Sequence, residues 1–62
     1  MLARFLRVTG IGPGHIRNVL DLADRVGIET PQDFAEMSEQ ELVVQGFKVL
    51  HARKILRALA PI

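Results

Sequence analysis

The 62-residue chain contains no cysteine, tryptophan or tyrosine, and only three phenylalanines. Without cysteine it can form neither a disulfide nor a thiolate zinc site, so any zinc would depend on histidine and carboxylate ligands. The same absence fits a reducing intracellular setting, either a nucleus or the cytoplasm of a bacterium or archaeon.

Long apolar runs are also missing. No segment approaches the roughly 20 apolar residues that a membrane-spanning helix requires, and Arg4 and Arg7 interrupt the N-terminal apolar stretch before it could serve as a signal peptide. We therefore expect no membrane partner. A chain this short forms one domain, taken as residues 1–62, and buries only about 60% of its unfolded surface, which leaves no room for a deep cleft.

Acidic residues are absent from both ends of the chain. Residues 1–20 carry three arginines and residues 42–62 carry two lysines and two arginines, while all seven acidic residues lie between Asp21 and Glu41 with Arg25 as the one basic residue. The net charge of +1 therefore conceals two basic ends and an acidic connector. Such segregation favours a dipolar molecule that binds an anionic partner through its basic side.

No group of residues has the composition of a catalytic centre. The sequence offers no nucleophile with a base partner and no cluster of metal-ligand residues. Asp33, Glu39 and Glu41 fall at expected helix starts, where the helix dipole favours negative charge, so they are interpreted as helix-start and surface residues. We predict that the protein is not an enzyme and has no catalytic residues, metal site or cofactor.

What the sequence does contain is a glycine-rich turn, Gly10 to Gly14, that runs directly into an amphipathic helix. Gly10 and Gly12 can take positive φ and bring the backbone close to a ligand, and Pro13 suits the first position of a helix. The first helical turn adds unpaired N–H groups and the positive end of the helix dipole. Together with Arg17, one turn further on, this segment is suited to holding a phosphate.

The segment repeats itself 36 residues later. The matched pairs are Gly10 and Gly46, Ile11 and Phe47, Gly12 and Lys48, His15 and His51, Ile16 and Ala52, Arg17 and Arg53, Val19 and Ile55, and Leu20 and Leu56. Leu6 also falls over Leu42 in the segment before each turn. The repeated unit is therefore a helix, a short turn and a second helix.

Apolar spacing and capping residues predict an all-α chain. The predicted helices are residues 2–8, a second helix ending near Val26 with Gly27 as its cap, a short helix with Thr30 as its N-cap and Pro31 at its first position, a helix opened by a Ser38–Glu41 capping box, and residues 49–60. The predicted core comprises Leu2, Phe5, Leu6, Ile16, Val19, Leu20, Ala23, Phe34, Met37, Leu42, either Val43 or Val44, Ala52, Ile55, Leu56 and Leu59.

With these residues the chain resembles the tandem helix-hairpin-helix family, in which two hairpins are joined by a short connector. The resemblance spans nearly the whole chain, with hairpins at about 2–26 and 38–60 and a connector at about 27–37. The first copy keeps both glycines of the family pattern, whereas the second has Lys48 where the second glycine belongs. The resemblance implies a compact five-helix bundle, related to the sterile alpha motif fold, that binds duplex or junction DNA through its phosphates without base readout. It also implies that the domain is part of a larger DNA repair, recombination or nuclease assembly.

The turn chemistry, the repeat and the resemblance together define the candidate DNA-binding residues. These are Gly10, Ile11, Gly12, Pro13, Gly14, His15 and Arg17 in the first copy, and Gly46, Lys48, Val49, Leu50, His51, Arg53, Lys54 and Arg57 in the second. The two histidines are either phosphate donors or polar residues of the first helical turn without a further role. Phe47 is either an exposed wedge or, as its aliphatic counterpart Ile11 favours, part of the core.

A second resemblance is to the sterile alpha motif, whose second half also joins a leucine-rich helix, a glycine with an aliphatic residue, and a basic helix, as Leu42 to Leu56 does. Those domains usually have one more residue between the glycine and the helical aliphatic than Gly46 and Ile55 allow. They also lack a turn like that at Gly10. This resemblance, ranked second, implies protein interaction or self-association, and the opposite charges of the connector and the two ends make head-to-tail association physically reasonable.

Overall fold

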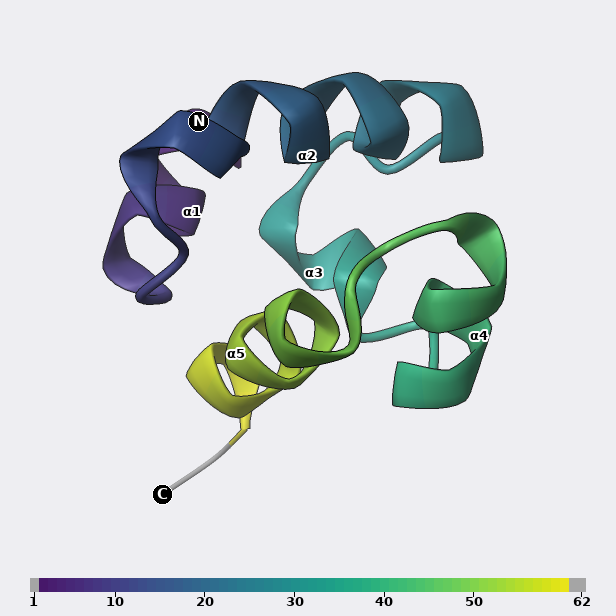
Figure 1. The fold of residues 1–62 in the computed structure, drawn as a ribbon. Helices are drawn as coiled ribbons and strands as arrows, with labels where there is room; N and C mark the ends of the chain where they lie inside the picture. Colours follow the sequence, from purple (N-terminus) through teal and green to yellow (C-terminus); the bar gives the residue numbers. More distant parts are fainter. Residues whose placement is uncertain (1, 61–62) are drawn as a thin grey trace.

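The computed structural model describes residues 2–60, which form five helices and no strand (Figure 1). The helices are α1 (Leu2–Val8), α2 (Pro13–Val26), α3 (Pro31–Phe34), α4 (Glu39–Gln45) and α5 (Val49–Leu59). Helix α1 packs on α2 and α4 packs on α5, and the short α3 contacts α5. The all-α prediction is confirmed, and the predicted helix bounds hold to within one or two residues.

Local capping explains where the helices begin and end. Asp33 accepts hydrogen bonds from the backbone N–H groups of Glu29 and Thr30, at 2.9 and 3.0 Å, which fixes the entry into α3. The predicted capping box opens α4: Ser38 N–H donates to the Glu41 carboxylate at 2.9 Å, and Glu41 N–H donates to Ser38 Oγ at 3.1 Å. These contacts confirm the sequence-based assignment of both helix starts.

The core joins the two helix pairs around α3 (Figure 1). Phe34 is fully buried, and its ring lies 6.3 Å from that of Phe5 on α1 and 5.8 Å, edge-on, from that of Phe47. The buried residues are Leu6, Ile11, Val19, Ala23, Ile28, Phe34, Leu42, Phe47, Ala52 and Ile55. Phe47 is therefore a core residue, as its aliphatic counterpart favoured, and it cannot act as an exposed wedge.

On α4, the structure decides which of the two valines belongs to the core. Val43 is half-buried, whereas Val44 is 76% exposed, so Val43 is the valine that faces the interior. The others predicted on buried stripes pack partly buried around the core: Leu2, Phe5, Ile16, Leu20, Met37, Leu56 and Leu59. Each amphipathic helix thus buries the stripe that its spacing indicates.

The sequence repeat is also a repeat of backbone conformation. Gly10 and Gly46 both have positive φ, +92° and +115°, and α2 and α5 each begin three residues later. The residues before these helices also match, with φ −57° and ψ 139° at Gly12 and φ −67° and ψ 146° at Lys48. Gly12 does not use the positive φ that glycine permits: its conformation is open to any residue, and lysine occupies the same place in the second copy.

Candidate functional site

The two helix pairs pack reciprocally across their turns. Here the first turn is residues 10–12 and the second turn is residues 46–48. Lys54 of α5 donates a hydrogen bond from Nζ to the Gly10 carbonyl oxygen at 3.1 Å. On the other side, Leu22 of α2 lies 3.5 Å from the position that a Cβ on Gly46 would occupy. Each long helix therefore lies against the turn of the other pair.

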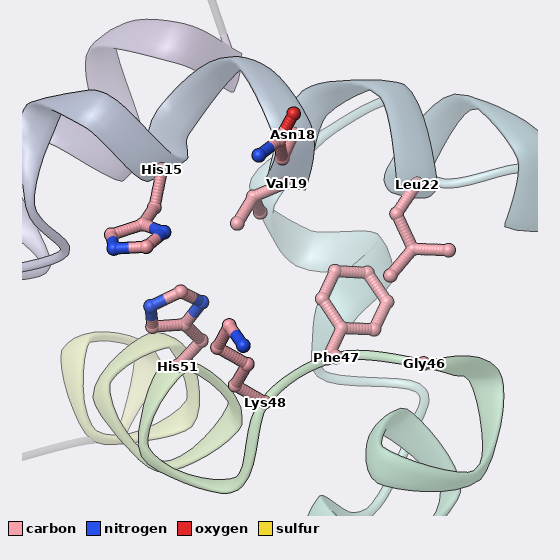
Figure 2. Close-up of a pocket in the computed structure, with 8 residues that line it drawn as sticks. All are labelled: His15, Asn18, Val19, Leu22, Gly46, Phe47, Lys48 and His51. Carbon is pink, nitrogen blue, oxygen red and sulfur yellow. The ribbon is translucent and has the colours of Figure 1, made fainter.

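The matched histidines meet where α2 and α5 approach each other. The ring centroids of His15 and His51 are 5.2 Å apart, and Figure 2 shows the two imidazoles pointing toward one another. Contact between equivalent positions is the arrangement expected of two units related by an approximate twofold axis. Burial lowers the pKa of His51, and the nearby His15, Lys48 and Lys54 lower it further. His51 is therefore neutral at pH 7 and offers one N–H donor.

A hollow lies between α2 and the second turn (Figure 2). Apolar side chains of Val19, Leu22 and Phe47 form part of its lining. The polar part comes from His15, Asn18, Lys48 and His51, and no carboxylate lines the hollow. Neither Asn18 nor Leu22 is among the site residues predicted from the sequence. Asn18 could have been found from its match with Lys54 at the same 36-residue offset.

The predicted amides of the first turn are only partly available. His15 N–H donates to the Gly12 carbonyl oxygen at 2.9 Å, and Ile11 N–H reaches Thr9 Oγ1 at 3.4 Å. Pro13 has no N–H. Within residues 2–60, the N–H groups of Gly12 and Gly14 make no hydrogen bond and remain available for an external acceptor.

The second turn also presents amides, but with bulkier side chains. The N–H groups of Lys48, Val49 and Leu50 have no acceptor within residues 2–60. Val49 is 44% and Leu50 61% exposed, where the first copy has Pro13 and Gly14. An anion can approach the second turn only beside these aliphatic groups, with Lys48 as the nearby cation.

The predicted basic residues fall into two groups. Arg17, Lys48 and Arg57 are exposed and form no ion pair within residues 2–60. Arg53 instead pairs with Glu39, with Nε 3.2 Å from Oε2, and Lys54 is engaged with the Gly10 carbonyl oxygen. The Arg53 pair is half-exposed, so it contributes at most about 1 kcal/mol and opens easily.

No three histidine, cysteine, aspartate or glutamate side chains of residues 2–60 gather closely enough to hold a metal ion. In the same residues, no helix has the length and apolar character needed to cross a bilayer.

Comparison with known proteins does not identify the chain: no family model matches it, and no curated protein or solved structure matches it significantly. A function for the chain is therefore inferred from the geometry of the two turns, the charges around them and the resemblance of the sequence motif.

Proposed function

We propose that the chain is a tandem helix-hairpin-helix module that binds the phosphate backbone of duplex or junction DNA without reading its sequence. The observation that carries this proposal is the repeated turn. Two turns of matching backbone conformation lead into helices whose first residues have free amides, at Gly12 and Gly14 in one and Lys48 to Leu50 in the other. Helix starts of this kind favour phosphate oxygens.

Exposed cations support the same proposal. Arg17 lies on α2, Lys48 in the second turn and Arg57 on α5, all without a carboxylate partner within residues 2–60. With Arg53 released from Glu39, about three to five phosphates would be neutralised, which gives a log–log salt slope of roughly −3 to −4.5. Backbone contacts of this kind position a protein on DNA but do not specify sequence. The module would hold a larger repair, recombination or nuclease assembly on DNA and supply no chemistry itself.

A matched pair of substitutions at Gly12 tests the proposal. Both Asp and Asn are favoured at the N-cap, and Gly12 has a φ of −57° that either residue can adopt, so Gly12→Asp and Gly12→Asn should both fold. Only the aspartate adds a negative charge where a phosphate would lie. We expect Gly12→Asp to abolish binding of a fluorescent duplex at low salt and Gly12→Asn to retain most of it. Equal affinity of the two variants would contradict the proposal.

A second candidate function is a protein-interaction module similar to a sterile alpha motif domain. It is favoured by the aliphatic side chains exposed around the second turn, Val44 at 76%, Val49 at 44% and Leu50 at 61%. Large apolar side chains exposed on a surface are candidates for contact with another protein. Light scattering distinguishes the candidates: concentration-dependent assembly, lost in Leu50→Ser, together with unchanged DNA anisotropy at low salt supports this one.

A further inference from the structure

One contact breaks the symmetry between the two halves. Lys54 Nζ donates to the Gly10 carbonyl oxygen at 3.1 Å across 44 residues of sequence. Its side chain also passes over the turn, since Lys54 Cδ lies 3.9 Å from where a Cβ on Gly10 would be. The position equivalent to Lys54 in the first half is Asn18, whose shorter side chain lines the hollow beside Gly46. No hydrogen bond from α2 to the second turn exists within residues 2–60.

We propose that Lys54 is a positioning residue that holds the first turn in its phosphate-binding conformation and does not itself neutralise a phosphate. This inference rests on the proposed function. It reassigns Lys54 from the set of DNA-contacting cations to the support of the turn, and it makes the first hairpin the more rigid of the two.

Gly10 determines the direction of the chain in the first turn. Its φ of +92° starts the first turn, and the peptide unit that follows it contains both the Gly10 carbonyl and the Ile11 N–H. A hydrogen bond from an ammonium group is stronger than one between neutral groups, so Lys54 fixes the orientation of this peptide. Because Lys54 is next to the fully buried Ile55, the turn is connected through α5 to the core.

The same contact removes an obstacle to anion binding. A bare carbonyl oxygen beside the turn would repel a phosphate, and the ammonium group covers that negative charge. A turn held in its bound conformation has less conformational freedom to lose, which raises affinity without adding a contact to the ligand.

Salt dependence separates positioning from direct contact. A cation that neutralises a phosphate contributes about 0.9 to the log–log salt slope, whereas a positioning residue contributes to affinity at every salt concentration alike. The test compares Lys54→Met with Lys48→Met, because both replace a lysine with an uncharged chain of similar length. We expect Lys48→Met to reduce the slope by about 0.9. Lys54→Met should keep the wild-type slope and weaken binding about threefold to tenfold throughout.

Two results would overturn the inference. A slope reduced by about 0.9 in Lys54→Met would make Lys54 a phosphate contact, and unchanged affinity would show that the turn does not need it. Circular dichroism of each variant confirms that the helices remain folded.

A measurement without DNA keeps this test separate from the proposed function. Amide hydrogen exchange at Ile11 and His15, whose N–H groups donate to Thr9 Oγ1 and to the Gly12 carbonyl oxygen, should accelerate about threefold to tenfold in Lys54→Met. It should remain unchanged at Gly46 and Phe47, the hydrogen-bonded amides of the second turn. In Asn18→Lys, which offers the second turn an equivalent ammonium group, exchange at Phe47 should slow. If the wild-type chain fails to bind DNA, the proposed function falls. If exchange at the first turn is unaffected by Lys54→Met, the positioning role falls instead.

Discussion

The first and second turns have nearly the same backbone but present different chemistry. Both begin with a glycine at positive φ and both end at an N-cap of extended conformation. The first then exposes Pro13 and Gly14, while the second exposes Val49 and Leu50 beside Lys48. In these two turns the fold requires glycine only where φ is positive, and the residues at the neighbouring positions differ.

Under the proposed function, the two turns bind phosphate through different groups. The first turn binds through its backbone amides and is held by Lys54. The second offers Lys48, a compact and mobile charge, with aliphatic groups around it. Substitutions at matched positions of the two halves test this difference.

The largest effect should come from the equivalent leucines of the two helix pairs. Leu6 and Leu42 are both fully buried, so Leu6→Ala and Leu42→Ala should each destabilise the fold by about 2–5 kcal/mol. In a domain this small, either change removes much of the stability. Urea unfolding followed by circular dichroism measures both. A large loss in one variant with none in the other would show that the two halves are not equivalent.

The next effect tests which glycines the turns require. The same substitution to serine at Gly10 and at Gly46 should cost about 1–2 kcal/mol each because both have positive φ. A Cβ would meet only ordinary van der Waals contacts there, so backbone strain is the main term. Gly12→Ser should be neutral or stabilising, since serine is a good N-cap and φ is −57°. If thermal unfolding shows that Gly12→Ser lowers stability as much as the other two substitutions, glycine is required at all three positions and the interpretation of Gly12 is wrong.

The histidine contact between the halves should make stability depend on pH. Burial and the neighbouring cations lower the pKa of His51 in the folded state below 6.5, its ordinary value. As pH falls through 6.5, the unfolded chain takes up the proton first, so stability declines until the pH is below the folded pKa. We expect the melting temperature to fall between pH 7 and pH 5 and His51→Gln to flatten this dependence. The same slope in both proteins would exclude His51 as its source.

The smallest effect should come from the exposed pair between Arg53 and Glu39. Glu39→Gln removes the pair and should change stability by less than about 1 kcal/mol, because both groups are half-exposed. It also frees Arg53, the counterpart of Arg17, for phosphate contact. DNA affinity at low salt should therefore rise about twofold to fivefold. Weaker binding in Glu39→Gln, measured by fluorescence anisotropy, would show that the pair positions Arg53 and does not compete with DNA.

The sequence predicts the helices and most of the core because those depend on local capping and apolar spacing. Ser38 with Glu41, Pro31 and Gly27 determine the helix ends within a few residues of themselves. The 36-residue repeat likewise predicts the similarity of the two turns.

The side-chain contacts of α5 could not be predicted in the same way. Lys54 with Gly10 and His15 with His51 depend on how the two helix pairs are oriented around Phe34. Arg53 with Glu39 depends on how α5 lies against α4. The sequence leaves the φ of Gly12 open for a different reason. Glycine permits positive φ but does not demand it, and only the match with Lys48 shows that this position is extended.

Amide chemical shifts recorded during titration with a short DNA duplex show whether both turns hold phosphates. If both turns hold phosphates, the largest shifts will occur together at Gly12 and Gly14 and at Lys48 to Leu50, and will diminish as salt is added. Shifts confined to α3 and α4, or shifts at Val44 and Leu50 that follow protein concentration and ignore DNA, would contradict it.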